Sequence, residues 1–432
     1  MHNTKSLKPT NTIISVQCAD LLIGMFVCEL DRPWSGTPFI PAGFHIRRAD
    51  ELQMLTKFCN SVQIDISRGV QPTKLKGNRL TILSSARKAS PISAAIKVNR
   101  SRYPVTSTVK KQLDSTDKSY QQLLQGFDLF TKTVRAKQPA DLDSLESPID
   151  CLVTSALCNP NTLVWCLNTD PVPVNPSAYC VRAAIWAVLL ARQIGLAKAE
   201  IRALFLGTLL ADIGLWLLPE HLVSKRQNFS KADFVQYQTH VELSLQFLGQ
   251  YQKLDQRVIR IVRGHHERND GRGFPNRLKG EQIPALARFA NLCYCFERLL
   301  RSLADKHNAS PAKAISRLYR QRDLKFPEQL VVEFIHLMGM YPIGTLIQLN
   351  TGEIAIVLEQ HEAEKLSPRI AVLTNGQQEK LLSPKIIQLG TTTEKRSVLS
   401  SIGPIHSAVK ASDYRFSFVG KRIGLGNYTI RF

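Results

Sequence analysis

The chain has 432 residues, 44% of them hydrophobic and 21% charged, with a formal net charge of +21 at pH 7. This length suggests two or three domains, and the composition is that of a globular protein with a sizeable core. We expect no secretory signal and no membrane span, because residues 1–12 are polar and the longest strongly apolar run, 183–191, is far shorter than the ~20 residues that cross a bilayer.

The nine cysteines are scattered along the chain and include no CxxC pair. This pattern indicates neither a disulfide framework nor a zinc knuckle. Reduced thiols are typical of cytosolic proteins, so we expect a cytoplasmic location.

Residues 1–66 are predicted to form a small α+β module. Strand-like and turn-like segments alternate from residue 13, and Leu52, Leu55 and Phe58 recur at helical spacing. Residues 62–66 then predict a short closing strand.

Residues 67–112 are predicted to form a basic linker. Eleven lysines and arginines precede Asp114 without one acidic residue among them. Such a run is either a solvated linker or a surface for nucleic acid, anionic lipid or an acidic partner, although Tyr103 is its only aromatic residue and does not favour single-strand binding. Basic, Ser-rich segments bury too little apolar surface to order themselves, so we expect exposure and protease sensitivity. The apolar stretch 80–83 could add a strand.

The rest of the chain changes character twice. Residues 113–340 carry apolar residues at helical spacing and predict packed helices. Residues 341–390 predict a β-rich extension, with alternating segments on either side of an Asn-Thr-Gly turn. Residues 391–432 form a basic tail that we expect to be poorly ordered.

The sharpest local pattern is HHERNDGRGFP at 265–275. Two adjacent histidines end an apolar helix and lead into a loop rich in Gly and Pro. This arrangement is typical of metal ligands beside a substrate loop, or of an ordinary capped helix end.

The string resembles the HHExxDGxGYP signature of HD-GYP phosphodiesterases, with Phe274 in place of the family's Tyr. Residues 209–225 are similar to the segment that carries the family's HD dyad, with Asp212 retained, Ala211 in place of His and Leu215 in place of Lys. Residues 13–66 resemble the small domain of unknown function that often precedes HD-GYP domains, and 326–390 resemble the family's C-terminal extension. The signature loop comprises Asp270, Gly271, Gly273, Phe274 and Pro275.

The resemblance implies a mainly α fold: an HD-type helical bundle with the small N-terminal α+β module and a short C-terminal β extension. Family members hold two or three metal ions, often iron or manganese, and hydrolyse cyclic di-GMP. By resemblance, three ligand positions of one ion are lost, at Tyr179, Ala211 and Tyr294. The retained ligands are Asp212, His240, His265 and His266, and the implied phosphate contacts are Arg268 and Arg288.

Three imidazoles and one carboxylate suit one divalent ion, iron or manganese, unless ordinary hydrogen bonds satisfy them and no metal is bound. The resemblance therefore favours a degenerate, non-catalytic regulator that binds cyclic di-GMP, a related nucleotide or a GGDEF-type protein. The alternative is an active cyclic di-GMP phosphodiesterase with a reduced metal site. A third hypothesis is association with nucleic acid through the basic linker.

Overall fold

The computed structural model describes residues 13–32, 44–46, 49–66, 68–70, 98–173, 175–224, 229–304, 310–339, 341–360, 368–391, 394 and 396–418. These residues fall into two compact units, one within Met1–Ile92 and one within Ser93–Phe432. Most of the predicted basic linker, including the apolar stretch 80–83, lies outside the described residues.

The described part of the N-terminal unit is an antiparallel sheet of four strands, in the order β1-β4-β2-β3, with one helix. Buried side chains from β2, α1 and β4, such as Val27, Leu55 and Ile64, form its core. The predicted α+β module is thereby confirmed. Its elements are β1 (Ile13–Gln17), the 3-10 helix η1 (Cys18–Asp20), β2 (Phe26–Leu30), β3 (Phe44–His45), α1 (Ala49–Phe58) and β4 (Ser61–Asp65).

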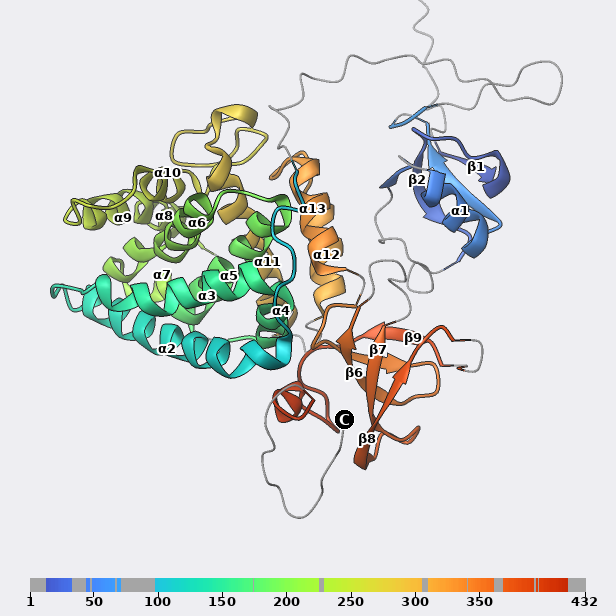
Figure 1. Cartoon of the computed structure of the whole chain (residues 1–432). Coiled ribbons are helices and arrows are strands. Elements are labelled where there is room, and N and C mark those ends of the chain that lie inside the picture. Colours follow the sequence, from blue (N-terminus) through green and yellow to red (C-terminus); the bar gives the residue numbers. More distant parts are fainter. Residues whose placement is uncertain are drawn as a thin grey trace, which may run out of the picture. The chain divides into compact units, whose positions relative to one another are not determined.

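The second unit is mainly helical, as predicted (Figure 1). Its central helix is α5, whose side chains are buried on nearly every side and which packs against α2, α3, α6, α11 and α13. A helix that is apolar all round is stable only inside a core. The helices are α2 (Val109–Arg135), α3 (Glu146–Cys158), α4 (Pro160–Thr169), α5 (Pro176–Ile194), α6 (Lys198–Leu210), α7 (Glu220–Ser224), α8 (Lys231–Gln238), α9 (His240–Leu248), α10 (Gln256–Gly264), α11 (Ala285–Ala304), α12 (Pro311–Tyr319) and α13 (Glu328–Met338), with 3-10 turns η3 (Asp143–Leu145), η4 (Ile213–Leu217) and η5 (Gly280–Gln282). None of the helices in the described residues is long and apolar enough to cross a bilayer.

A buried ion pair joins α5 to α11. Arg182 Nε lies 3.1 Å from Glu297 Oε2, and the two side chains are 2% and 0% exposed. Trp186 Nε1 donates to the other carboxylate oxygen at 2.6 Å, and Arg182 donates to the Leu167 carbonyl at 2.9 Å. Burying a charge is costly unless it is paired and hydrogen-bonded, and both conditions are met here.

Part of the predicted linker is ordered, which corrects the expected boundary at 113. Helix α2 already begins at Val109, and residues 99–103 lie along the end of α5. Asn99 N donates to the Ile194 carbonyl at 2.7 Å, and Tyr103 Oη donates to the Leu196 carbonyl at 2.8 Å. Backbone carbonyls at a helix C-terminus lack partners within the helix, and this segment supplies them.

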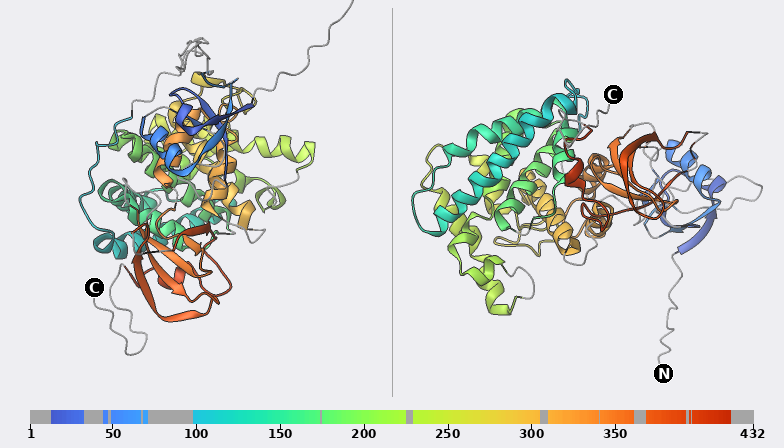
Figure 2. Two further views of the ribbon diagram at one scale, coloured as in Figure 1. Left: turned by 90° about the vertical axis from the view of Figure 1, so that its right-hand side faces the viewer. Right: turned by 90° about the horizontal axis from the view of Figure 1, so that it is seen from below.

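The described C-terminal strands form one antiparallel sheet of five strands in the order β8-β7-β6-β5-β9 (Figure 2). This confirms the predicted β extension. Buried residues such as Ile347, Val357 and Val372 form its core. The strands are β5 (Leu346–Leu349), β6 (Ile354–Glu359), β7 (Arg369–Thr374), β8 (Lys380–Gln388) and β9 (Val398–Ser401).

The expected disorder of the tail is wrong for residues 396–418, while 392–393, 395 and 419–432 lie outside the described residues. Strand β9 pairs with β5, and a 3-10 turn, η6 (Ala411–Tyr414), follows. Arg415 is 6% exposed and pairs with Asp117 of α2 and with Asp170. Trp165 Nε1 donates to the Arg415 carbonyl at 2.8 Å. Two carboxylates from distant helices therefore hold this part of the tail in place, which composition alone did not indicate.

We predict that trypsin leaves Arg102 uncut in the native chain, because its guanidinium donates to the Gly195 carbonyl at 3.0 Å and the adjoining backbone is bound to α5. Mass spectrometry of early fragments should place the start of the stable C-terminal fragment before Asn99. The heat-unfolded chain, cut at Arg102, is the control. Early native cleavage there would contradict this packing.

We predict that Glu297→Ala lowers the free energy of unfolding by about 3–5 kcal/mol, because it leaves the buried Arg182 guanidinium unpaired. Urea unfolding followed by far-UV circular dichroism measures this. Arg202→Ala is the control, since that side chain is 37% exposed and its pairs with Glu146 and Asp150 should contribute at most about 1 kcal/mol. Equal effects of the two substitutions would contradict the prediction.

Candidate metal centre

Four side chains predicted as metal ligands converge at one point. Asp212 follows α6 and precedes η4, His240 begins α9, and His265 and His266 follow α10. Their ligand atoms all lie within 4.8 Å of one another. Three of the four residues are buried, while the His266 side chain is 20% exposed and opens the cluster to solvent.

One carboxylate oxygen forms the middle of the cluster. Asp212 Oδ1 lies 3.2 Å from His240 Nε2, 3.3 Å from His265 Nε2 and 3.8 Å from His266 Nε2. The Nε2 atoms of His240 and His265 are themselves 3.4 Å apart. Four potential ligand atoms thus surround a common point, although they come from three separate segments of the chain.

Backbone carbonyls fix the orientation of two of the imidazoles. His240 Nδ1 lies 2.6 Å from the Tyr237 carbonyl, and His265 Nδ1 lies 2.7 Å from the Val262 carbonyl. A carbonyl oxygen only accepts, so each Nδ1 carries a hydrogen and each Nε2 is directed at the cluster. This arrangement is common for metal-bound histidines.

The donor set fits a cation. Burial lowers the pKa of His240 and brings that of His266 well below its ordinary value, so these imidazoles are neutral at pH 7. The Nε2 atoms of these imidazoles lie beside the Asp212 carboxylate, and together they form a set of nitrogen and oxygen donors that would suit a divalent ion. Neutral histidine and carboxylate are also the protonation states that divalent ions require.

The turn after α6 is held against α9 by close backbone contact. A Cβ atom on Gly214 would lie 2.1 Å from the His240 carbonyl oxygen, so only glycine fits. Ser244 Oγ accepts from Gly214 N at 2.8 Å and donates to the Ala211 carbonyl at 3.1 Å. These contacts fix Asp212 relative to His240.

Two phenol rings lie near the cluster, at the positions where the resemblance predicts lost ligands. Tyr179 of α5 and Tyr294 of α11 are each 6% exposed, with ring centroids 5.4 Å apart, and the Tyr294 ring lies 5.9 Å from that of His265. Tyr179 Oη donates to the Tyr294 carbonyl at 2.5 Å, and Tyr294 Oη donates to the Thr208 carbonyl at 2.7 Å. Burial raises the pKa of Tyr294 well above its ordinary value, so this phenol stays protonated.

The remaining replaced positions are apolar and enclosed. Ala211 and Leu215 are both 0% exposed. Leu215 stands where the family has lysine, and its side chain belongs to the core. Neither residue offers a lone pair or a charge.

The signature loop is anchored by Glu267, whose role the sequence analysis did not identify. Glu267 is 1% exposed, and its carboxylate accepts from the backbone N–H groups of Asn276 at 2.7 Å and Leu278 at 2.9 Å. Gly273 passes so close that a Cβ would lie 2.4 Å from Arg268 N. In the sequence, the position of this glutamate directly after the paired histidines was the available signal.

The two arginines assigned as phosphate contacts have partners within the chain. Arg268 makes a bidentate pair with Asp270, at 3.0 and 2.6 Å, and this pair lowers the pKa of the Asp270 carboxyl. Arg288 is 7% exposed and donates to the Ile283 carbonyl at 3.0 Å. Their contact with phosphate remains a prediction.

Tyr237, which precedes the ligand His240, is a second contact that sequence reasoning missed. Its hydroxyl lies 3.4 Å from His266 Nε2, and its ring centroid lies 4.8 Å from that of His240. The aromatic residues spaced along 229–237 were the available signal.

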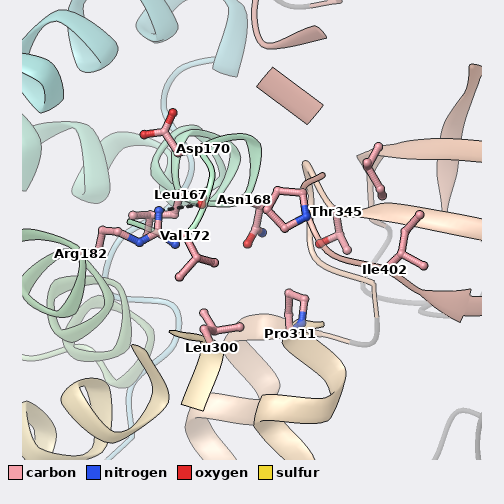
Figure 3. Close-up of a pocket in the computed structure, with 11 residues that line it drawn as sticks. Leu167, Asn168, Asp170, Val172, Arg182, Leu300, Pro311, Thr345 and Ile402 are labelled. Carbon is pink, nitrogen blue, oxygen red and sulfur yellow. Dashed lines mark hydrogen bonds between the residues drawn. The ribbon is translucent and has the colours of Figure 1, made fainter. Parts of the chain in front are cut away.

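A separate cavity lies beside the C-terminal sheet of the same unit (Figure 3). Its volume is about 20 Å³, with Arg182, Asp170 and Thr345 among the lining residues. That volume accommodates about one water molecule, so this cavity cannot hold a nucleotide. The Asp212 cluster remains the candidate site.

Comparisons with known proteins match two family models and several relatives. The HD domain family matches residues 169–330, and a domain of unknown function, DUF3391, matches residues 13–145. The chain is 26% identical over 381 residues to the cyclic di-GMP phosphodiesterase PA4108 of Pseudomonas aeruginosa, covering 87% of this chain and 88% of that protein.

Two further proteins match in part. The cyclic di-GMP phosphodiesterase response regulator RpfG of Xanthomonas campestris is 30% identical over 156 residues, covering 36% of this chain and 41% of that protein. Among solved structures, the HDG"Y"P protein Bd1817 of Bdellovibrio bacteriovorus aligns with a TM-score of 0.44 and 16% identity, over 75% of this chain and 99% of that one. The chain therefore carries an HD domain preceded by a DUF3391 domain, and it is homologous to the HD-GYP cyclic di-GMP phosphodiesterases.

Proposed function

We propose that this chain is a degenerate HD-GYP-type protein of cyclic di-GMP signalling, which binds the nucleotide or a related one and regulates without hydrolysing it. The observation that carries the proposal is the contrast between the complete Asp212 cluster and the two phenols beside it. Tyr179 and Tyr294 use their hydroxyl hydrogens on backbone carbonyls. The homologues named above are cyclic di-GMP phosphodiesterases, which supports the choice of nucleotide.

Asp212, His240, His265 and His266 would hold one divalent ion, and imidazole with carboxylate suits iron or manganese. When bound, such an ion neutralises charge on a phosphoryl oxygen. Carbonyl partners orient the rings of His240 and His265, and Asp212 supplies the negative charge. The partly exposed His266 side chain lies on the side from which a phosphate would approach.

Hydrolysis places more demands on the site than binding does. Charge develops on both the attacking and the leaving oxygen of a phosphodiester, and two ions stabilise both. The positions of the second ligand set hold Tyr179, Ala211 and Tyr294, and a protonated phenol is a poor ligand for a hard cation at neutral pH. Leu215 adds no charge, because it is apolar and buried.

The second candidate function is slow hydrolysis at the reduced site. The intact four-residue cluster favours it, since a single ion can still polarise a phosphoryl oxygen. Turnover measurements decide between the two candidates. Binding of a GGDEF-type protein, or of nucleic acid by the basic segment, remains a prediction from the sequence.

We predict that the purified chain, loaded with iron or manganese under reducing conditions, holds about one ion per chain by elemental analysis. His265→Ala should lose most of that metal, because it removes a buried ligand. His221→Ala is the matched control, since His221 lies on α7 outside the cluster and is 53% exposed. Two ions per chain, or metal retained in the His265 variant, would contradict the assignment.

We also predict that the metal-loaded chain hydrolyses cyclic di-GMP not at all, or far more slowly than an intact HD-GYP enzyme in the same buffer. The physical reason is the missing second set of ligands. Chromatography of the nucleotide products measures this. Robust, metal-dependent turnover that His266→Ala abolishes would contradict this prediction and show that the chain is an active phosphodiesterase.

A further inference from the structure

An aromatic surface borders the metal centre on its open side. We use the term aromatic face for Phe229, Phe234, Tyr237 and Phe274. Phe274 stacks on the His266 imidazole, with ring centroids 4.4 Å apart and planes 25° from parallel. Phe234 lies edge-on to Phe274 at 6.1 Å and nearly parallel to Tyr237 at 6.4 Å. The face is therefore continuous with a candidate ligand.

Helix α8, which carries part of this face, takes little part in the core. Of its residues, none is buried, and Phe234 and Val235 are 44% and 64% exposed. Its N-terminus is nevertheless well formed: Ser230 Oγ accepts from Asp233 N at 3.1 Å, and the Asp233 carboxylate accepts from Ser230 N at 3.2 Å. This capping box stabilises the helix without burying its aromatic side chain.

We propose that Phe234, supported by Tyr237 and Phe274, stacks against a purine base of the nucleotide whose phosphate is held at the Asp212 cluster. This inference rests on the proposed function and adds to it the place where the base lies. A nucleotide combines an anionic phosphate with a flat aromatic base, and the chain offers a cation site and exposed aromatic rings side by side. Stacking tolerates any base but strengthens with ring size, which favours purines.

In this proposal, the Asp212 cluster contacts the phosphate, and the adjoining aromatic face contacts the base. His266 belongs to both, because its Nε2 faces Asp212 at 3.8 Å while its ring stacks on Phe274. A ligand that reaches the cluster therefore lies next to the aromatic face. Stacking of a flat base on the half-exposed Phe234 ring is favourable, since it removes apolar surface from solvent.

The test is calorimetric titration of the full-length, metal-loaded chain with cyclic di-GMP. Phe234→Ala should weaken binding at least about fivefold, the lower end for loss of one aromatic stacking partner. Phe234→Tyr keeps the ring and should retain most of the affinity. Val235→Ala is the matched control, since it removes an exposed apolar side chain from the same helix and should change nothing. Circular dichroism checks that each variant is folded.

Other outcomes separate this inference from the proposed function. Cyclic di-GMP binding that is equal in the wild type and Phe234→Ala overturns the stacking inference alone. A wild type that binds inorganic phosphate but no purine nucleotide also overturns it, while the ion site stands. A wild type that binds neither overturns both. If Phe234→Ala instead converts a dimer to a monomer in size-exclusion chromatography without changing affinity, the aromatic face is a protein interface and the inference is wrong.

Discussion

A buried carboxylate must be balanced, and the arrangement around Asp212 follows from that requirement. Asp212 is 2% exposed, and ring nitrogens of three imidazoles lie within 4 Å of its Oδ1. Two of those imidazoles are oriented by carbonyls three residues upstream, so that each Nε2 is directed at the carboxylate. A buried carboxylate among imidazoles at these distances is a donor set that a cation would stabilise. The ends of α6, α9 and α10 bring the four groups together.

The neighbouring phenols are also buried polar groups, but they carry no charge. Tyr179 and Tyr294 fill space with rings and direct their hydroxyls to backbone carbonyls, which leaves no charge to balance. Burial then keeps Tyr294 protonated, because a phenolate in that position would be poorly solvated. One half of the site thus depends on a cation, whereas the other half is stable as ordinary core. The fold can retain the first half without the second.

Much of this site could be predicted from the sequence because a long motif carried it. The string at 265–275 and the segment around Asp212 identified three of the four residues that the structure brings together, and the family position of the next ligand identified His240. The helical bundle and both β modules followed from apolar periodicity. Long-range pairing could not be predicted. Arg415 is one of many basic residues until Asp117 and Asp170 lie beside it.

The prediction of a solvated linker was wrong for residues 98–112, the part of the basic segment that the structure describes without a gap, and for the same reason. Its charges predicted a solvated linker, yet Arg100 pairs with Glu333 at 2.6 Å, and Arg102 and Tyr103 satisfy carbonyls at the end of α5. Charge density describes how a segment would behave alone, whereas order here comes from partners about 90 to 230 residues away. A local pattern therefore predicts best where a site is built from short motifs.

Binding and turnover can be separated in such a site because they draw on different groups. Holding a nucleotide requires one positive centre for the phosphate and a flat surface for the base, and both could be supplied by residues in contact with His266. Turnover requires a second centre of positive charge where bonds break, and in the proposed function that place is taken by Tyr179 and Tyr294, whose hydroxyls donate to backbone carbonyls. In the proposed function, the replacements therefore remove catalysis with little effect on recognition. The signature loop, anchored by Glu267 independently of any ion, keeps Phe274 against His266 in either case.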